Sequence, residues 1–290
     1  MLRQPRAAVA LVTLLTATAA AQAPSRSRLE ALLTRVGARV EAYYARAQHI
    51  VCLETVRVQP LGYDLRSDGF ARRLEYELRI AWEPPGGADD QPAANVVRQL
   101  LRVGGRPPRP GDEPQCMDPR PVSTEPLAML LPDRRDAFVF TADGTGRSGG
   151  RDAVIIAYRS AERGPAEVTW RDECVSIELP GRSAGRIWVD EATGDVLQLD
   201  ERLLGQFDLT VPPEHARFGP QHMTIERADS TTRYAPVSFD DPEETLMLPK
   251  SIESIQVIRG SGVPRVRTTQ SFTEYRRFLT GARIVPNPDR

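Results

Sequence analysis

The spacing of apolar residues changes once along the chain, close to residue 50. From Ser25 to His49 the apolar side chains recur every three or four residues, which predicts an amphipathic helix with one apolar stripe. That stripe consists of Leu29, Leu32, Leu33, Val36, Val40, Tyr43 and Tyr44. Beyond Ile50 the spacing becomes two, which is the period of a β-strand. A single strong helix followed by strands has to bury its stripe against a sheet.

Residues 70–82 have the clearest alternation in the chain. The apolar set is Leu74, Tyr76, Leu78, Ile80 and Trp82, and the polar set between them is Arg73, Glu75, Glu77 and Arg79. This pattern predicts a long antiparallel strand with one face on the core and the other in water.

Further strand signals follow with turn residues between them. They cover residues 50–59, 96–103, 137–141, 153–158, 167–179, 185–204 as a hairpin, 206–211, 223–234, 246–258 and 263–272. Residues 125–131 are expected to form one or two helical turns, and 271–278 either strand or short helix. One helix cannot cover both faces of such a sheet. We therefore expect one α+β domain over residues 24–280, with a strongly curved, mostly antiparallel sheet and the helix packed on its concave face.

The N-terminal residues 1–23 have the pattern of a secretory signal peptide. Arg3 and Arg6 precede an uncharged run from Ala7 to Ala20, and Ala21-Gln22-Ala23 is a small-residue cleavage site. A short membrane anchor is the alternative, but the run is short for a bilayer. No later stretch is apolar enough to span a membrane, so we expect a periplasmic or secreted protein with a flexible tail at 281–290.

The three cysteines outside the signal sequence allow one internal disulfide. Cys116 lies in a proline-rich irregular segment that would gain from a covalent tie, and Cys174 lies in a strand-like run. We expect these two to pair in an oxidising compartment. Cys52 lies in an apolar strand and is expected to be a buried thiol. No metal site is expected, because there is no CxxC motif and no suitably spaced histidine.

Two GxSxG strings leave a serine hydrolase open as an alternative, with Ser148 or Ser183 as nucleophile. Downstream acids together with His215 or His222 could complete a triad. A nucleophilic serine of this type needs a turn from a strand into a helix, and both strings are instead followed by strand-like sequence. The GxGxxG string at 144–149 also precedes a strand, so we expect no dinucleotide cofactor. We favour a protein without catalytic activity.

The hairpin Gly185–Leu204, GRIWVDEATGDVLQLDERLL, is the most distinctive local motif. Asp190 can accept hydrogen bonds from backbone N–H groups in a type I turn, and Gly194 supplies a positive φ. The motif resembles the W-x-D-x-x-T-G segment of the LolA/LolB-type periplasmic lipoprotein carriers. Residues 248–253 (LPKSIE) and 269–278 (TQSFTEYRRF) resemble their late strands, and the whole layout resembles exported bacterial proteins of the same plan. This resemblance implies an unclosed half-barrel with an acyl-binding cavity.

A curved sheet with a helix across it can enclose a cavity for a lipid or acyl chain. The residues expected to line it are Leu33, Val36, Val40, Tyr76, Leu78, Ile80 and Trp82. Alternatively, side chains such as Tyr76, Trp82, Trp188 and Phe207 fill this space. The expected function is binding of lipid or lipidated ligands, or a scaffold role in cell-envelope assembly. The expected partners are an acyl chain, a lipoprotein or an envelope protein; the net charge of −1, or −3 without Arg3 and Arg6, argues against nucleic acid.

Overall fold

The structure is a computed structural model, and it describes most of the chain after the predicted signal peptide. The described residues are 26–47, 49–83, 93–112, 116, 118–119, 125–171, 174–216, 221–241 and 243–277. The predicted signal peptide at 1–23 and the predicted tail at 281–290 lie outside them. Within the described part of the chain, no helix has the length and apolar character needed to cross a membrane.

Strands dominate the fold after one N-terminal helix, α1 (Arg26–Arg46). Two short 3-10 helices, η1 (Glu125–Leu130) and η2 (Arg135–Ala137), lie between β3 and β4. The strands are β1 (Ile50–Pro60), β2 (Arg72–Glu83), β3 (Ala93–Val103), β4 (Phe138–Ser148), β5 (Arg151–Ser160), β6 (Glu167–Arg171), β7 (Cys174–Glu178), β8 (Ser183–Val189), β9 (Val196–Leu203), β10 (Phe207–Thr210), β11 (His222–Asp240), β12 (Glu243–Arg259) and β13 (Arg265–Arg277).

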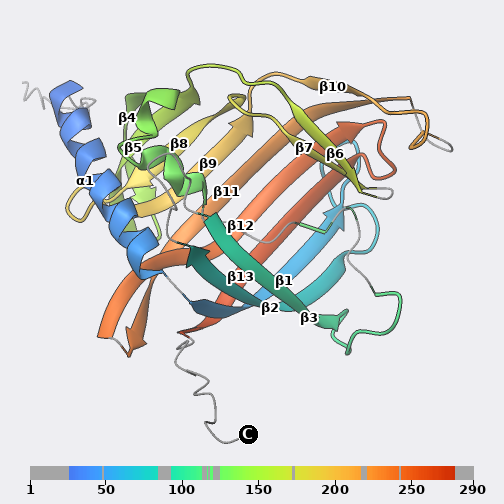
Figure 1. Ribbon diagram of the computed structural model, residues 1–290, viewed down its shortest axis with the longest axis horizontal. Helices are drawn as coiled ribbons and strands as arrows, with labels where there is room; N and C mark the ends of the chain where they lie inside the picture. Colours follow the sequence, from blue (N-terminus) through green and yellow to red (C-terminus); the bar gives the residue numbers. More distant parts are fainter. Residues whose placement is uncertain are drawn as a thin grey trace, which may run out of the picture.

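Eleven of these strands form one antiparallel sheet with the order β3-β2-β1-β13-β12-β11-β9-β8-β5-β4, and β10 pairs with β11. The path ends at β3 on one side and at β4 on the other, so the sheet is not closed. Figure 1 shows it as a strongly curved layer with α1 at one end. The predicted α+β fold, an unclosed and mostly antiparallel half-barrel, is confirmed.

Helix α1 buries its predicted stripe on the concave face, which we call the inner face. Leu32, Leu33, Val36 and Val40 are at most 3% exposed, and they share one core with inner-face residues of the strands. Leu127, Met129 and Leu130 of η1 complete this core. Packing by α1 and η1 therefore fills the inner face at this end of the sheet.

One strand prediction was wrong. Residues 167–179 were expected to form one strand, but they form β6 and β7, which pair with each other as a separate two-stranded sheet. The apolar positions show why: Val168 and Trp170 are even-numbered, whereas Val175 and Ile177 are odd-numbered. A continuous strand would place these pairs on opposite faces, and a hairpin brings them to the same side. This hairpin crosses in front of the main sheet in Figure 1.

Several strands extend further than their sequence signals. The signal at 137–141 continues to Ser148, and the signal at 223–234 continues to Asp240. Residues 143–148 (DGTGRS) contain no apolar side chain, so no apolar alternation predicts the second half of β4, although inner and outer positions alternate through the whole strand. A register shift relative to β5 lies between Ala142 and Thr145. The open choice at 271–278 is settled as strand up to Arg277.

The turn of the β8–β9 hairpin has the predicted chemistry. One Asp190 carboxylate oxygen accepts hydrogen bonds from the N–H groups of Ala192 and Thr193, at 2.9 and 3.0 Å. Gly194 has a φ of +74°, which a residue with a side chain rarely adopts. A Cβ atom at Gly194 would lie 3.5 Å from the Arg35 backbone, so the turn lies directly against α1.

Ion pairs hold α1 to this turn. Arg28 pairs with Glu191 at 2.6 Å on the surface, and Arg39 pairs with the largely buried Asp195 at 2.8 Å. Arg151 of β5 lies 3.4 Å from the second oxygen of Asp195. The β8–β9 hairpin therefore clamps the helix to the sheet.

Candidate functional site

The inner face carries side chains of different character along its length. Strand register places Ile156, Ile187 and Leu199 together on this face, where they contact the α1 core. The next residues along the strands are polar, among them Glu201, Ser230, Ser254 and Thr268. At the end of the sheet away from α1, the inner face again carries aliphatic side chains, namely Leu203, Ile225 and Ile258. The inner face thus has a filled apolar end, a polar middle and a second apolar end.

A buried ion pair lies in the part of the inner face formed by β1, β2 and β3. Glu54 is fully buried and receives two hydrogen bonds from Arg98, at 2.7 and 2.8 Å. Gln270 donates a third at 2.9 Å, and the Arg98 guanidinium lies 3.8 Å from the centre of the Tyr76 ring. This cluster divides the α1 core from a smaller apolar cluster around Val56. The Glu54 carboxylate and the Arg98 guanidinium are satisfied by these partners.

The predicted disulfide is present and ties two inner-face segments together. Cys116 is bonded to Cys174, the first residue of β7. Asp118, close to Cys116, forms an ion pair with Arg72 of β2, in which the guanidinium donates a hydrogen bond to the carboxylate at 3.1 Å. The loop that holds Cys116 is therefore fixed to the sheet by Asp118 and to the β6–β7 hairpin by the disulfide. Cys52 is a buried thiol, as predicted; burial and the nearby Glu54 carboxylate raise its pKa to about 12.

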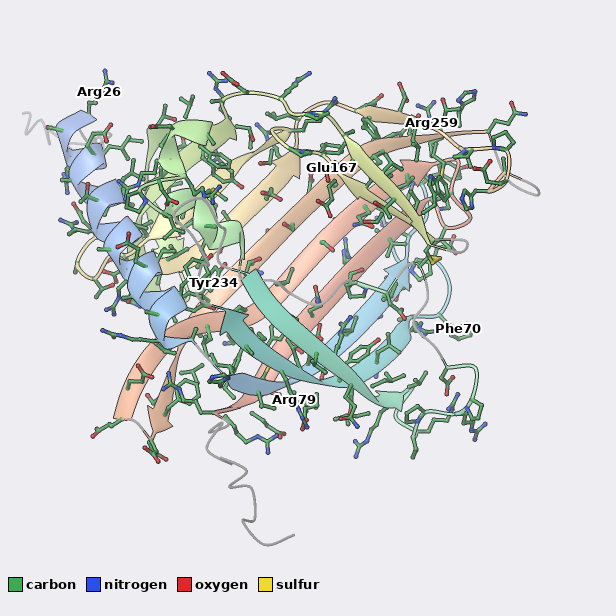
Figure 2. The ribbon with its side chains drawn as sticks, viewed as in Figure 1. Arg26, Phe70, Arg79, Glu167, Tyr234 and Arg259 are labelled. Atoms are coloured by element: carbon green, nitrogen blue, oxygen red, sulfur yellow. A yellow bond between two sulfur atoms is a disulfide. The ribbon has the colours of Figure 1, made fainter. Side chains whose placement is uncertain are left out.

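A cavity of about 280 Å³ lies between β7 and the inner face. Its aliphatic lining consists of Ile177, Leu179, Leu203, Ile225, Ala228 and Ile258. Its polar lining consists of Arg182, Ser183, Glu201, Arg202 and Gln256. In Figure 2, Glu167 marks the start of the hairpin in front of the sheet. We call this cavity the hairpin pocket; its size is close to the lower end of the roughly 300–1,000 Å³ range of small-molecule sites.

Glu201 belongs to the polar lining of the hairpin pocket, and Tyr158 of β5 lies next to it outside the pocket. The Tyr158 hydroxyl lies 3.3 Å from a Glu201 carboxylate oxygen. Gly185 lies between them in the sheet; a Cβ atom there would clash with the Asp200 backbone carbonyl and lie 2.9 Å from the Tyr158 ring, so this position requires glycine. Burial raises the pKa of Glu201, and the hydrogen bond from Tyr158 partly opposes that rise.

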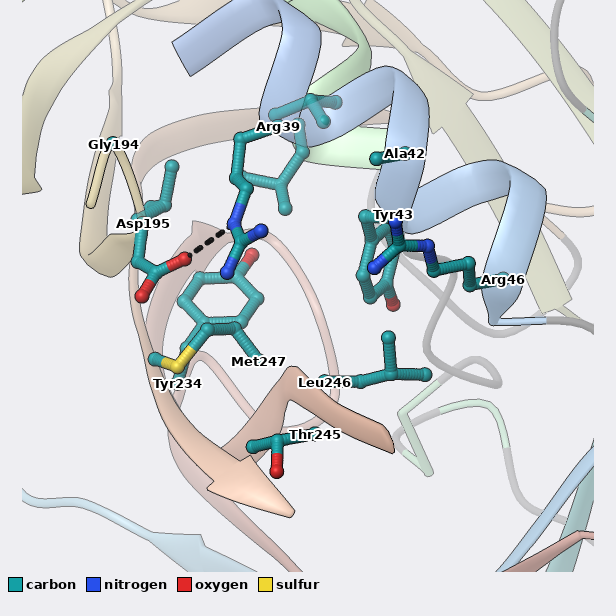
Figure 3. A pocket seen from close by; sticks show the side chains of 13 residues that line it. Arg39, Ala42, Tyr43, Arg46, Gly194, Asp195, Tyr234, Thr245, Leu246 and Met247 are labelled. Carbon is teal, nitrogen blue, oxygen red and sulfur yellow. Dashed lines mark hydrogen bonds and ion pairs between the residues drawn. The ribbon is translucent and has the colours of Figure 1, made fainter. Parts of the chain in front are cut away.

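A second and much smaller pocket lies where α1 meets the β8–β9 turn. Figure 3 shows Arg39 and Asp195 on one side of it and Tyr234, Leu246 and Met247 on the other. Its volume is about 40 Å³, which is enough for water but not for an acyl chain.

The predicted cavity-lining residues lie in two places. Leu33, Val36, Val40, Leu78 and Ile80 are together in the α1 core, and Tyr76 belongs to the separate Val56 cluster. Val40 lines the small pocket in Figure 3, and none of these six residues lines the hairpin pocket. The side chain of Trp82 lies outside the described residues.

The structure also places Trp188 and Phe207, which belong to the alternative of an interior filled by side chains. Trp188 lies on the outer face, because its neighbours Ile187 and Val189 point into the core. Phe207 pairs with Ile225, close to the hairpin pocket.

The outer face has a shallow groove of about 730 Å³ across β4, β5, β8, β9, β11 and β12. Its lining mixes arginines with acidic residues, and pairs such as Arg186–Asp143 and Arg227–Asp229 neutralise one another. The groove therefore presents a mixed surface, with paired charges beside apolar side chains such as Val139 and Ile255.

The two candidate nucleophiles have ordinary structural roles. Ser148, at the end of β4, donates a hydrogen bond to Gln198 at 3.1 Å. Ser183 lies 3.3 Å from Ser160 across β5 and β8. His215 instead stacks on Trp170, with ring centres 4.4 Å apart. Within the described ranges, neither serine has a histidine as hydrogen-bond partner, and no group of three or more His, Cys, Asp or Glu residues is arranged to hold a metal.

Comparisons with known proteins give structural neighbours only. No protein-family model matches the sequence, and no curated protein is significantly similar to it. An outer membrane lipoprotein-sorting protein domain from Vibrio parahaemolyticus is 11% identical, covers 87% of this chain and 94% of its own, and has a TM-score of 0.38. A LolA superfamily protein from Nitrosomonas europaea is 9% identical over 86% and 93% of the two chains, with a TM-score of 0.33.

A third neighbour is a DUF1329 family protein from Desulfovibrio piger, which is 9% identical over 87% and 94% of the two chains, with a TM-score of 0.39. At these identities and scores, function has to be argued from the side chains of the site.

Sequence reasoning missed the hairpin pocket and the Glu54 cluster. The cluster had a signal, since Glu54 is in phase with Cys52 and Val56 on the buried side of β1. A carboxylate in phase with buried apolar residues predicts a buried partner. The hairpin pocket had a weaker signal, the change of phase between Trp170 and Val175, which marks the hairpin that forms its roof.

Proposed function

We propose that this protein binds an acyl chain of a lipid or lipidated molecule in the hairpin pocket. The observation that carries the proposal is the pairing of an aliphatic floor, from β9, β11 and β12, with an aliphatic roof from β7. A methylene chain between these surfaces would be removed from water, at about 0.8 kcal/mol for each buried CH₂ group. The polar lining at Arg182 and Glu201 would face the polar end of the ligand.

The compartment we propose is the periplasm. The signal-like sequence at 1–23 and the Cys116–Cys174 disulfide both support export into an oxidising environment. Lipids and lipoproteins that cross such a space need their acyl chains shielded from water, which is the task that a binding protein with an apolar pocket performs.

Filling the pocket tests the proposal. Ala228 lies in the pocket floor, and Ala228→Trp would occupy the space of at least two methylene groups. We expect binding of a long-chain fluorescent fatty acid to weaken about tenfold or more, because each lost CH₂ contact costs about 0.8 kcal/mol. Equilibrium titration of the fluorescence measures this.

The matched control is Ala157→Trp, the same substitution on the outer face of β5. It should leave the affinity unchanged. The proposal fails if the unmodified protein does not bind the fatty acid, or if the two tryptophan variants bind it equally well.

A further inference from the structure

Arg182 lies at the edge of the hairpin pocket without an acidic partner. It precedes β8, and its carbonyl oxygen accepts a hydrogen bond from the Leu204 N–H at 2.8 Å, which fixes its backbone. Its guanidinium lies 5.4 Å from the centre of the Phe207 ring. The Nε atom is buried and donates no hydrogen bond, and among the residues that the structure describes no carboxylate lies within ion-pair distance.

Two other arginines on the inner face have acidic partners. Arg98 is paired with Glu54, and Arg72 is paired with Asp118. A guanidinium that is partly removed from water and has no acceptor is unfavourable in the empty protein. An anionic group at this position would supply the missing acceptor.

We propose that Arg182 binds the anionic head group of the acyl ligand, so that the pocket selects amphiphiles with one acyl chain and a carboxylate or phosphate head. This inference rests on the acyl-binding function proposed above. The planar guanidinium matches both head groups, since each offers two oxygens to its parallel N–H donors. The chain would then lie over Ile177, Leu179 and Ile258, which line the same cavity.

Two features of the site favour an anion there. The Phe207 ring centre lies 5.4 Å from the guanidinium carbon, within cation–π range, which helps to hold the side chain while its buried Nε remains without an acceptor. Glu201 is the acidic residue of the same pocket, and burial raises the pKa of its carboxyl, which lessens the negative charge that an incoming anion would meet.

The test compares dodecanoate, dodecyl phosphate and 1-dodecanol, which share one chain length and differ in head group. The full chain should bind the two anions at least tenfold more tightly than the alcohol, as expected for hydrogen bonds to a charged group. Arg182→Met should lower both anion affinities to that of the alcohol and leave the alcohol affinity unchanged. Arg182→Lys should keep part of the preference for anions over the alcohol, because lysine retains the positive charge but lacks the parallel N–H donors of the guanidinium.

The controls separate this inference from the proposed function. Arg159→Met removes an arginine from the outer-face groove and should change none of the affinities. Equal binding of dodecanol and dodecanoate by the unmodified protein overturns the role of Arg182 and leaves acyl binding intact, whereas no binding of any probe overturns both. Inorganic phosphate should compete only weakly; competition as strong as that of dodecyl phosphate would show a free-anion site and contradict the inference.

Discussion

Glu54 and Arg98 form a buried ion pair on the inner face. Glu54 is 0% exposed, and Arg98 retains only 10% of its side-chain exposure, so each depends on the other. Removing one partner of such a pair leaves an uncompensated charge in the interior, whereas replacing both with apolar residues is often tolerated. The different effects of single and double replacement therefore test whether Glu54 and Arg98 form a structural ion pair.

Arg98→Met is expected to destabilise the protein by about 3–5 kcal/mol, because Glu54 then keeps only Gln270 as a partner. The double variant Glu54→Leu/Arg98→Met should recover most of that loss. Urea unfolding of both variants measures the difference. A cost below about 1 kcal/mol for the single variant would mean that water reaches Glu54 and that the cluster is not dry.

Glu201 predicts a dependence of stability on pH. Burial raises its pKa in the folded protein, so the folded state holds the proton more tightly than the unfolded chain. The contribution of Glu201 to stability is therefore complete below the unfolded-state value of about 4.3 and is lost as the pH rises through the folded-state value. Glu201→Gln should be more stable than the unmodified protein at pH 7 and no more stable at pH 4.

Denaturation midpoints at several pH values between 4 and 8 measure this effect. The difference between the two proteins should grow with pH. A constant difference across this range would show that Glu201 is as well solvated in the folded protein as in the unfolded chain.

At the scale of elements, the β8–β9 turn holds α1 in place on the inner face. The buried Asp195 joins Arg39 of the helix to Arg151 of β5. Asp190 supports the turn itself; although burial acts in the opposite direction, hydrogen bonds from the Thr193 N–H and from Arg151 lower its pKa. The resemblance of this hairpin to the carrier superfamily thus has a structural meaning here, as the clamp of the helix.

Asp195→Asn should destabilise the protein by about 1–3 kcal/mol, because it weakens charge-assisted hydrogen bonds that are partly buried. Hydrogen–deuterium exchange should become faster in α1 and remain unchanged in β13. Glu191→Gln is the control in the same turn; its ion pair with Arg28 is exposed, so its effect should stay below about 1 kcal/mol. Equal exchange in α1 for both variants would contradict the clamp.

At the scale of the whole molecule, the periodicities of the chain predict the fold well. The step from a 3.6-residue to a two-residue period at Ile50 predicts one helix on a curved sheet, and the Asp190–Gly194 turn chemistry predicts the central hairpin. The disulfide also followed from the sequence, because Cys52 lies in phase with buried apolar residues and leaves Cys116 and Cys174 to pair.

The location of the candidate site could not be predicted in the same way. Alternation shows which residues face inward but not which of them another element covers. Leu33, Val36 and Val40 share a core with Leu78 and Ile80 because α1 packs there. The hairpin pocket lies under β6 and β7, for which the sequence pattern predicts a single strand. An unpaired arginine such as Arg182 has no sequence signal at all, because pairing is decided by contacts between distant strands.

Photolabelling with a fatty acid that carries a diazirine at the end of its chain tests directly whether the acyl chain binds beneath β7. Peptide mapping of the labelled full chain should place the label on residues 174–179 of the hairpin or on 225–228 and 256–258 of the floor. Label on residues 29–44 of α1 or 74–80 of β2 would mean that the helix moves away and the predicted core residues line the true cavity. That result, or the absence of any specific label, would contradict a binding site beneath β7.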